Sequence, residues 1–266
     1  MDGEPEAELN ADEGRSRWSE SLEPGRGGPQ LIPRPHEVEL GGAPAWVAAQ
    51  RRRTRLTLDD VAYRLDGLSI ERSLQMVGDA DRRSAVAIVL SHGEHGLEVL
   101  LTRRAWHMRT HRGEIAFPGG GEEHGDVFPV GTALREACEE VSLDTRIVAP
   151  VGALDPMLTV SSNRAVVPVV FATEQRPTVI ESPEEVDAIL HVPFRDLLEP
   201  GCYRRELWTW NEPGAATRYR HPVHFFELFG DTLWGATASM LNQLLTVLYA
   251  PEAFDRSVRN GELYGR

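Results

Sequence analysis

Residues 130–141 constrain this chain more than any other segment, because apolar side chains recur there with the period of a helix. The apolar positions lie at i, i+3, i+4, i+7, i+8 and i+11, and they are Val130, Ala133, Leu134, Ala137, Cys138 and Val141. This pattern predicts one buried helical face. Glu136, Glu139 and Glu140 are expected on the opposite face, where side chains three or four residues apart are neighbours at ~5–6 Å.

Three neighbouring carboxylates repel one another unless something compensates their charge. At an effective dielectric constant of ~20, two unit charges at this separation repel by roughly 3 kcal/mol. Mg²⁺ binds oxygen ligands and usually shares them with substrate phosphates, so a divalent cation would make the cluster favourable. A solvated acidic helix face is the alternative. Residues 117–121, Phe-Pro-Gly-Gly-Gly, favour a metal site, because glycines let the backbone approach a ligand closely.

Residues 120–143 resemble the signature of the Nudix hydrolases, which is Gly, five residues, Glu, seven residues and Arg-Glu-(apolar)-x-Glu-Glu-x-Gly-(apolar). The second half matches at Arg135, Glu136, Glu139 and Glu140. The chain departs from the signature in three places. Asp126 stands at the position of the first Glu, the following gap is one residue longer, and Ser142 replaces the closing Gly.

The upstream segment is similar to a subgroup of this family, the coenzyme A pyrophosphatases. Their pattern is Leu-Leu-Thr-x-Arg-(Ser/Ala)-x3-Arg-x3-Gly-x3-Phe-Pro-Gly-Gly, and residues 100–120 agree with it at every fixed position. The subgroup also commonly carries an acidic residue and a longer loop like those seen here. The resemblance covers roughly residues 83–250.

The resemblance implies a pyrophosphatase that cleaves coenzyme A, or an acyl or oxidised form of it, to 4′-phosphopantetheine and 3′,5′-ADP. The implied cofactor is Mg²⁺ or Mn²⁺, and the implied metal ligands are Glu136, Glu139 and Glu140, with the Gly120 carbonyl as a further contributor. Arg135 is expected to hold the carboxylates by charge-assisted hydrogen bonds, with Asp126 as its partner across the loop.

Other expected site residues lie on either side of the glutamate helix in the sequence. A guanidinium fork suits phosphate oxygens, so the substrate-binding candidates are Arg103, Arg104, Arg109, His111 and Arg112. The general base is sought at Glu185 or its neighbour Glu184, with a solvated role as the alternative. Two other functions stay open: hydrolysis of ADP-ribose or another nucleotide sugar, and a catalytically silent domain that binds a nucleotide and regulates a partner.

Composition excludes some classes of protein. The net charge of −13 argues against a general nucleic-acid binder, which needs a basic surface. No apolar run approaches the ~18 residues that would indicate a membrane span. Cys138 and Cys202 have no metal-binding spacing and are interpreted as reduced structural residues, which is consistent with a cytoplasmic protein. A homodimer is left open.

We predict an α/β fold, the α/β/α sandwich with a mixed sheet that is typical of Nudix enzymes. Residues 1–40 are too polar to form a core and are expected to be disordered, 41–82 form a helical appendage, 83–250 the hydrolase domain and 251–266 a tail. Strands are expected at 84–90 and 97–102 as a hairpin, and at 114–117, 147–154, 166–171 and 223–229. Pro168 suggests that its strand is an edge or bulged strand. Helices are expected at 130–141, 196–198 and 237–248.

Overall fold

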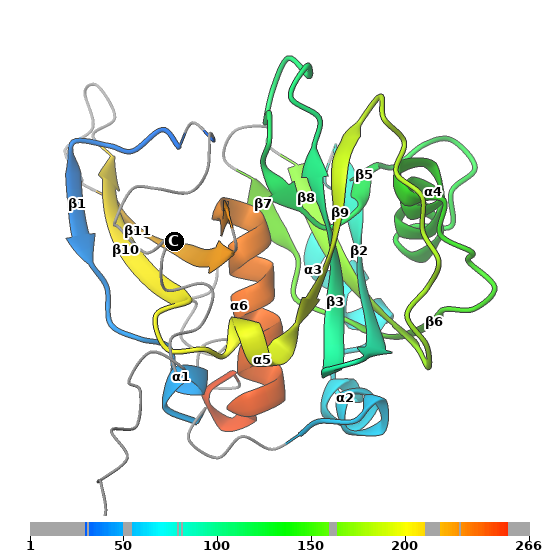
Figure 1. The fold of residues 1–266 in the computed structure, drawn as a ribbon, viewed down its shortest axis with the longest axis horizontal. Coiled ribbons are helices and arrows are strands. Elements are labelled where there is room, and N and C mark those ends of the chain that lie inside the picture. The colour runs from blue at the N-terminus through cyan, green and yellow to red at the C-terminus, as the bar shows by residue number, and fades with distance from the viewer. Residues whose placement is uncertain are drawn as a thin grey trace, which may run out of the picture.

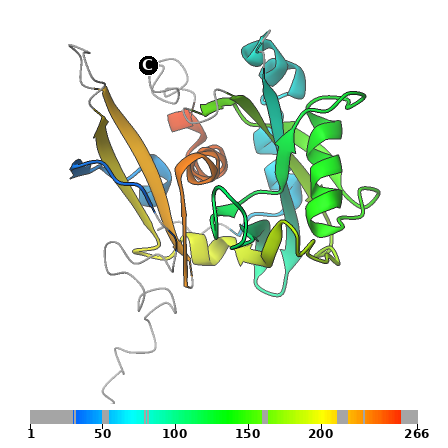
Figure 2. The same ribbon diagram turned by 90° about the horizontal axis from the view of Figure 1, so that it is seen from above.

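The computed structural model describes residues 30, 32–49, 55–78, 80, 82–159, 164–210, 219–228 and 230–254. Its elements stack in layers, with helix α6 (Gly235–Tyr249) between a four-stranded sheet and an eight-stranded sheet (Figures 1 and 2). Helix α4 (Val130–Val141) covers the other face of the larger sheet. The larger sheet between α6 and α4 confirms the α/β class and the helix–sheet–helix order.

Two parallel strands, β2 (Arg83–Gly93) and β8 (Arg164–Thr173), form the centre of the larger sheet. Strand β3 (Gly96–Arg104) pairs antiparallel with β2 through a tight turn, so the predicted hairpin is confirmed. The remaining strands are antiparallel to these: β4 (Ile115–Ala116) and β9 (Val186–Pro193) on β3, β5 (Gly119–Gly121) on β2, and β6 (Ala149–Ala153) and β7 (Met157–Thr159) on β8. The sheet is therefore mixed, as predicted.

The prediction that Pro168 marks an edge or bulged strand is wrong, because β8 lies inside the sheet. Pro168 pairs with Val86 of β2, and its carbonyl accepts a hydrogen bond from the Leu154 N–H at 2.9 Å. In a strand, the nitrogen and carbonyl of one residue point the same way. The missing N–H of Pro168 therefore faces the break between β6 and β7, where no ladder bond is lost.

The smaller sheet was largely missed by the sequence analysis. Its order is β1-β10-β11-β12, and all its pairings are antiparallel. The strands are β1 (Glu37–Leu40), β10 (Tyr203–Trp210), β11 (Tyr219–Leu228) and β12 (Asp231–Trp234). Strand β1 belongs to the segment 1–40 that was expected to be disordered, and most of that segment lies outside the described residues. The strand alternates polar and apolar residues, but four residues inside a polar tail are too few for this alternation to stand out.

Short helices carry the chain between the two sheets. They are α1 (Ala45–Ala49), α2 (Leu58–Leu65), α3 (Ile70–Val77) and α5 (Phe194–Leu197). Trp46 of α1 is fully buried and donates an indole hydrogen bond to Asn242 of α6 at 2.8 Å. The expected helical appendage is therefore packed into the core. Residues 251–254 are helical, and the rest of the expected C-terminal tail lies outside the described residues.

The core has two parts that α4 and α6 define. One lies between the two sheets around α6, and the other joins α4 to the larger sheet through Ala133, Ala137, Val141, Val89 and Phe171. The second part packs α4 against β2 and β8. In the described part of the chain, no helix combines the length and the apolar character that crossing a bilayer requires.

Candidate active site

Helix α4 has the predicted bounds but a slightly different rotation. Its buried stripe runs through Ala133, Ala137, Glu140 and Val141, which lie at i, i+4, i+7 and i+8. Two expectations are therefore wrong: Cys138 is exposed instead of buried, and Glu140 is only 7% exposed instead of facing solvent. The two residues are 200° apart on a helix of 3.6 residues per turn, so burial of one favours exposure of the other.

Glu140 is buried because a distant loop covers the end of α4. Residues 180–186 run along the helix terminus just before β9 (Figure 1). The Ile180 N–H donates to the Val141 carbonyl at 2.9 Å, and the Ser182 N–H donates to the Glu140 carbonyl at 2.8 Å. This loop also carries Glu185, and it brings that residue close to the α4 carboxylates.

The carboxylates of Glu136, Glu140 and Glu185 lie close enough where these elements meet for their charges to interact. Burial raises the pKa of Glu140 to about 8, and the nearby charges of Glu136 and Glu185 raise it further, while Arg104 and the Gly119 N–H oppose the shift. Burial also raises the pKa of Glu136, with Arg135 opposing and Glu139 and Glu185 adding to the shift. A raised carboxyl pKa means that the folded protein disfavours the charged form. A bound cation would remove that penalty.

Arg135 makes the contacts that were expected of it. Its Nη1 donates to Glu139 at 3.0 Å, and its Nη2 donates to Glu136 at 3.0 Å and to the Gly121 carbonyl at 2.8 Å. Nε and Nη2 also reach Asp126, at 3.2–3.4 Å. The hydrogen bond with Arg135 is the main reason that the pKa of Asp126 is lowered. Aspartate has a shorter side chain than the Glu of the Nudix signature, and the loop here is one residue longer. Asp126 nevertheless reaches Arg135.

The glycine at position 120 leaves room for a carboxylate. Gly120 lies on β5, which pairs with β2 directly beneath α4. A Cβ atom at this position would overlap the carboxylate of Glu136. The glycine therefore allows Glu136 to lie against the strand, next to the Gly120 backbone.

Arg103 and Arg104 were both expected at the substrate, but they point in opposite directions. Successive side chains of a strand alternate between its faces. Arg103 donates to Asp187 and Asp231, each at 2.8 Å, so the structure does not bring it to the carboxylates. Arg104 lies near Glu185, with Nη1 at 3.9 Å from Oε2, and its buried Nε has no hydrogen-bond partner among the described residues. Neither aspartate was predicted from the sequence.

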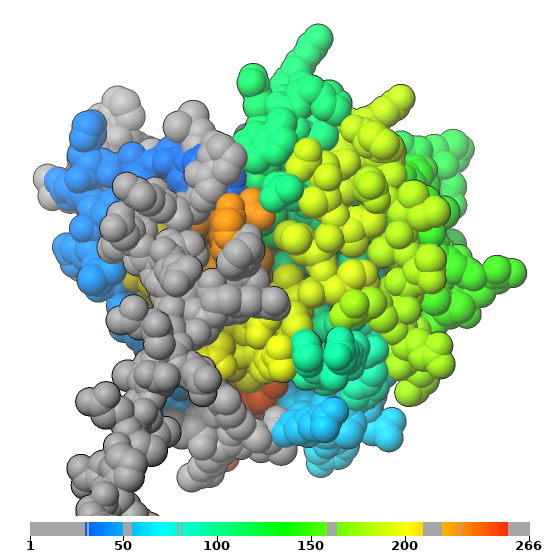
Figure 3. All heavy atoms as spheres, in the orientation of Figure 1, coloured from blue at the N-terminus to red at the C-terminus, as the bar shows by residue number. Residues whose placement is uncertain are grey.

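The other substrate-binding candidates lie in the loop between β3 and β4, and all three are exposed: Arg109, His111 and Arg112. His111 has a positive φ of 57°, and its Nδ1 lies 2.9 Å from Glu114 Oε2. The loop contacts the one before β9, because His107 Nε2 is 3.0 Å from the Glu184 carbonyl. Figure 3 shows both loops projecting side by side at the top of the molecule. The exposed side chains of Arg109, His111 and Arg112 therefore stay substrate-binding predictions.

The donor atoms suit a hard divalent cation, although Arg135 holds two of them. Carboxylate oxygens are the ligands that Mg²⁺ and Mn²⁺ prefer, and the raised pKa of Glu140 marks a place where positive charge is lacking. Within the described ranges, no three His, Cys, Asp or Glu side chains are already grouped to hold an ion. Glu139 is mostly exposed, and its carboxylate is hydrogen-bonded to Arg135.

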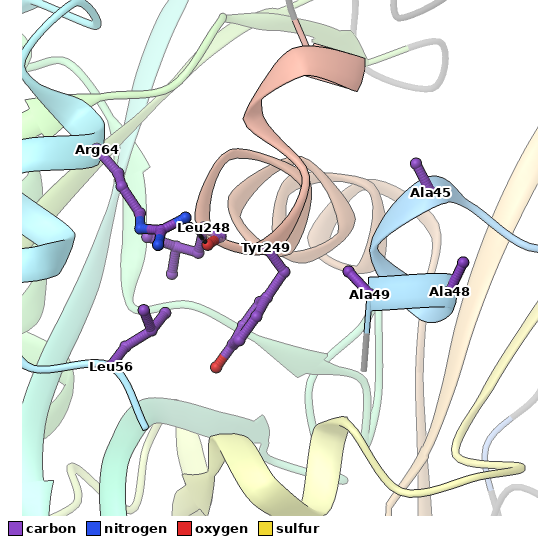
Figure 4. Close-up of a pocket in the computed structure, with 7 residues that line it drawn as sticks. All are labelled: Ala45, Ala48, Ala49, Leu56, Arg64, Leu248 and Tyr249. Carbon is purple, nitrogen blue, oxygen red and sulfur yellow. Dashed lines mark hydrogen bonds between the residues drawn. The ribbon is translucent and has the colours of Figure 1, made fainter. Parts of the chain in front are cut away.

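A separate pocket of about 400 Å³ lies near the end of α6 (Figure 4). Its lining residues are Ala45, Ala48, Ala49, Leu56, Arg64, Leu248 and Tyr249. The Arg64 Nη1 donates to the Leu248 carbonyl at 2.6 Å, and burial raises the pKa of Tyr249 to about 12. The lining comes from α1, α2, α6 and Leu56 and includes no residue of α4, so the pocket is separate from the α4 carboxylates.

Comparison with known proteins identifies the family. The NUDIX domain matches residues 81–211. The chain is 36% identical over 216 residues to Nudix hydrolase 22, chloroplastic, of Arabidopsis thaliana, an alignment that covers 77% of this chain and 66% of that protein. It is 33% identical over 203 residues to the uncharacterized Nudix hydrolase NudL of Salmonella typhi, covering 72% of this chain and 94% of the relative. The chain belongs to the Nudix family.

The similarity to the plant relatives is partial in length. The chain spans 66% of Nudix hydrolase 22 and 61% of Nudix hydrolase 15, mitochondrial, also of Arabidopsis thaliana. Among solved structures, a MutT/nudix family protein from Enterococcus faecalis is similar with a TM-score of 0.39 and 16% identity, over 78% of this chain and 76% of that one. The names of the relatives state a family and in some cases a compartment, and none of these names states a substrate.

Proposed function

We propose that this chain is a pyrophosphatase that uses Mg²⁺ or Mn²⁺ to hydrolyse the diphosphate of coenzyme A, or of an acyl or oxidised derivative. The products would be 4′-phosphopantetheine, or its acyl form, and 3′,5′-ADP. The observation that carries the proposal is the burial of Glu140 beside Glu136 and Glu185, because a buried and poorly compensated carboxylate indicates a functional site. A cytoplasmic location and a homodimer stay predictions.

The carboxylates of α4 would hold the metal. Glu136 and Glu140 lie against the sheet, and Glu139 is held on the surface by Arg135. Exposed ion pairs contribute only about 0–1 kcal/mol, so Glu139 can exchange Arg135 for a cation at little cost. A bound divalent ion would neutralise phosphate charge and lower the pKa of a bound water.

Other residues of the chain would bind and orient the substrate. Within the described part of the chain the Nε–H of Arg104 has no partner, which suits a charge-assisted hydrogen bond to a diphosphate oxygen. Glu185 lies next to Arg104 on the loop that covers α4, so it can accept the proton of an attacking water. Arg135 would keep the carboxylates in place through its contacts with Asp126 and Gly121.

The choice of coenzyme A rests on the match to the subgroup pattern and on the exposed arginines of the β3–β4 loop. Coenzyme A carries a 3′-phosphate that ADP-ribose lacks. Because Arg103 is held by two aspartates, the arginines left for this extra phosphate are Arg109 and Arg112, which are exposed on the β3–β4 loop. A charge-assisted hydrogen bond contributes ~1.5–3 kcal/mol. A substrate without the 3′-phosphate should therefore have a measurably lower kcat/KM.

The test is a substrate panel with Mg²⁺ and with Mn²⁺, with products separated by chromatography. Coenzyme A should be cleaved, and dephospho-coenzyme A should show a kcat/KM lower by roughly 10- to 100-fold, since each 1.4 kcal/mol is about tenfold. Equal hydrolysis of dephospho-coenzyme A or ADP-ribose would overturn the coenzyme A assignment in favour of a nucleotide-sugar hydrolase. A protein that binds these nucleotides and cleaves none would fit a silent regulatory domain.

A further inference from the structure

The strand that leads away from Glu185 contains a β-bulge. Strand β9 pairs antiparallel with β3, where Arg103 faces Ala188 but Arg104 faces Val186. Asp187 is therefore the extra residue of the bulge. A bulge bends its strand and changes the direction of nearby side chains, often beside an active site. Glu185 precedes the paired part of β9, and its carbonyl accepts a 2.8 Å hydrogen bond from the Ala105 N–H.

The bulge is held in place by the other sheet. Arg103 Nε donates to Asp187 Oδ2, and its Nη1 donates to Asp231 Oδ2, each at 2.8 Å. Asp231 is the first residue of β12 in the four-stranded sheet and is 4% exposed. One arginine therefore connects the bulge residue to a buried carboxylate of a different layer.

This arrangement is costly as a purely structural contact. The Oδ1 atom of Asp231 is buried without a hydrogen-bond partner among the described residues. A buried polar atom without a partner destabilises the folded protein. Proteins tolerate such costs most often at functional sites, and the bulge lies one residue from Val186 and two from Glu185.

We propose that Asp231 is a positioning residue. Through Arg103 and Asp187 it fixes the bulge, and thereby fixes Glu185 beside the carboxylates of α4. The inference rests on the proposed function, because it gives Glu185 a part in catalysis. It means that a residue of the smaller sheet controls the rate of the chemical step.

The first test is a double-mutant cycle on the full chain with coenzyme A. Asp231→Asn keeps the shape of the side chain and removes its charge, and it should lower kcat by about 10-fold while KM changes by less than about 3-fold. Glu185→Gln should lower kcat by itself, and adding Asp231→Asn to it should have no further effect, because coupled residues are not additive. If Asp231→Asn lowers kcat by the same factor in wild type and in the Glu185→Gln variant, the proposal is overturned.

A buried ion pair elsewhere provides the matched control. Asp155 is 1% exposed and pairs with Arg72. Asp155→Asn removes the same charge from a similar environment and should lower the melting temperature without changing kcat. If it lowers kcat as much as Asp231→Asn does, the effect of Asp231 is general destabilisation and the proposal fails.

Hydrogen exchange gives a readout that does not depend on activity. In Asp231→Asn, exchange should accelerate at the Ala105 amide and in residues 182–187, and in Asp155→Asn it should stay at the wild-type rate there. Unchanged exchange in Asp231→Asn would overturn the positioning role. If no diphosphate is hydrolysed, the proposed function fails, but exchange still decides this inference. Asp187→Asn replaces Asp231→Asn, with the same expected outcomes, if the latter does not fold.

Discussion

Buried glutamates are compensated in the four-stranded sheet and poorly compensated on α4. In the sheet, Glu206 accepts a hydrogen bond from Trp208 at 2.7 Å and pairs with Arg204 at 3.2 Å. Glu227 pairs with the same arginine and accepts a hydrogen bond from Thr232 at 2.6 Å. Each of these carboxylates therefore meets both a cation and a neutral donor inside the protein.

Glu140 is as buried as those two residues but has a different environment. Among the described residues, no arginine forms a salt bridge with it, and its charge is opposed by Arg104 at longer range and by the Gly119 N–H. Its acidic neighbours Glu136 and Glu185 raise its pKa instead. Compensated charge in the sheet serves folding, whereas the missing positive charge on α4 is what a metal ion would supply.

The largest expected effect is on turnover. Glu140→Gln should lower kcat by a factor of ~10² or more with little loss of fold, because it removes a proposed metal ligand from the cluster. Turnover and melting temperature should be measured together. Glu123→Gln is the matched control, since Glu123 is 70% exposed, touches the same Arg135 and should lose less than about 3-fold. Full activity of Glu140→Gln would remove α4 from the catalytic account.

In the compensated sheet, the corresponding change should affect stability. Glu206→Gln leaves Arg204 without part of its counter-charge and weakens a charged hydrogen bond, so the free energy of unfolding should fall by about 1.5–3 kcal/mol. Denaturant unfolding measures this. Glu39→Gln in β1 is the control, because Glu39 and its partner Arg220 are both 58% exposed, and the loss there should be below about 1 kcal/mol. Equal losses of unfolding free energy in the two variants would show that the buried network stabilises the fold no more than the exposed pair does.

A smaller effect is expected on the pH dependence of the same sheet. Burial lowers the pKa of His224 from 6.5 to about 4, and Arg205 adds to the shift. The unfolded chain therefore binds more protons at this histidine between these values. The contribution of His224 to stability is complete above pH 6.5 and is lost as the pH falls through 4. Unfolding of wild type and His224→Asn at several pH values should show a weaker acid dependence in the variant. Parallel curves would contradict the prediction.

The periodicity of apolar residues predicted those elements that depend on local sequence. The bounds of α4 and the β2–β3 hairpin follow from repeats within one segment, and both are confirmed. The contacts of Arg135 with the glutamates were expected from the family resemblance, and the contact with Glu139 also agrees with a spacing of four residues on a helix. The burial of Glu140 was not predictable in this way, since it depends on residues 180–186, which are distant in sequence.

Strand alternation was a signal that the sequence analysis did not use. Adjacent residues of β3 had to point to opposite faces, so Arg103 and Arg104 could not both reach one site. Their partners were not predictable, because Asp187 lies in a bulge and Asp231 in another sheet. Strand β10 was missed for a related reason, since its charged residues find buried partners across the sheet and leave no apolar alternation in the sequence.

The most direct test of uncompensated charge on α4 is the melting temperature of metal-free wild type and Glu140→Gln from pH 4.5 to 8.5, without and with Mn²⁺. The pKa of Glu140 rises from 4.5 to about 8 on folding, so this carboxyl holds more protons in the folded protein over that range, and its contribution to wild-type stability should fall as the pH rises. We expect Glu140→Gln to melt higher than wild type at pH 8.5 without metal, and to gain less from Mn²⁺. A variant that melts lower and responds fully to Mn²⁺ would contradict the account.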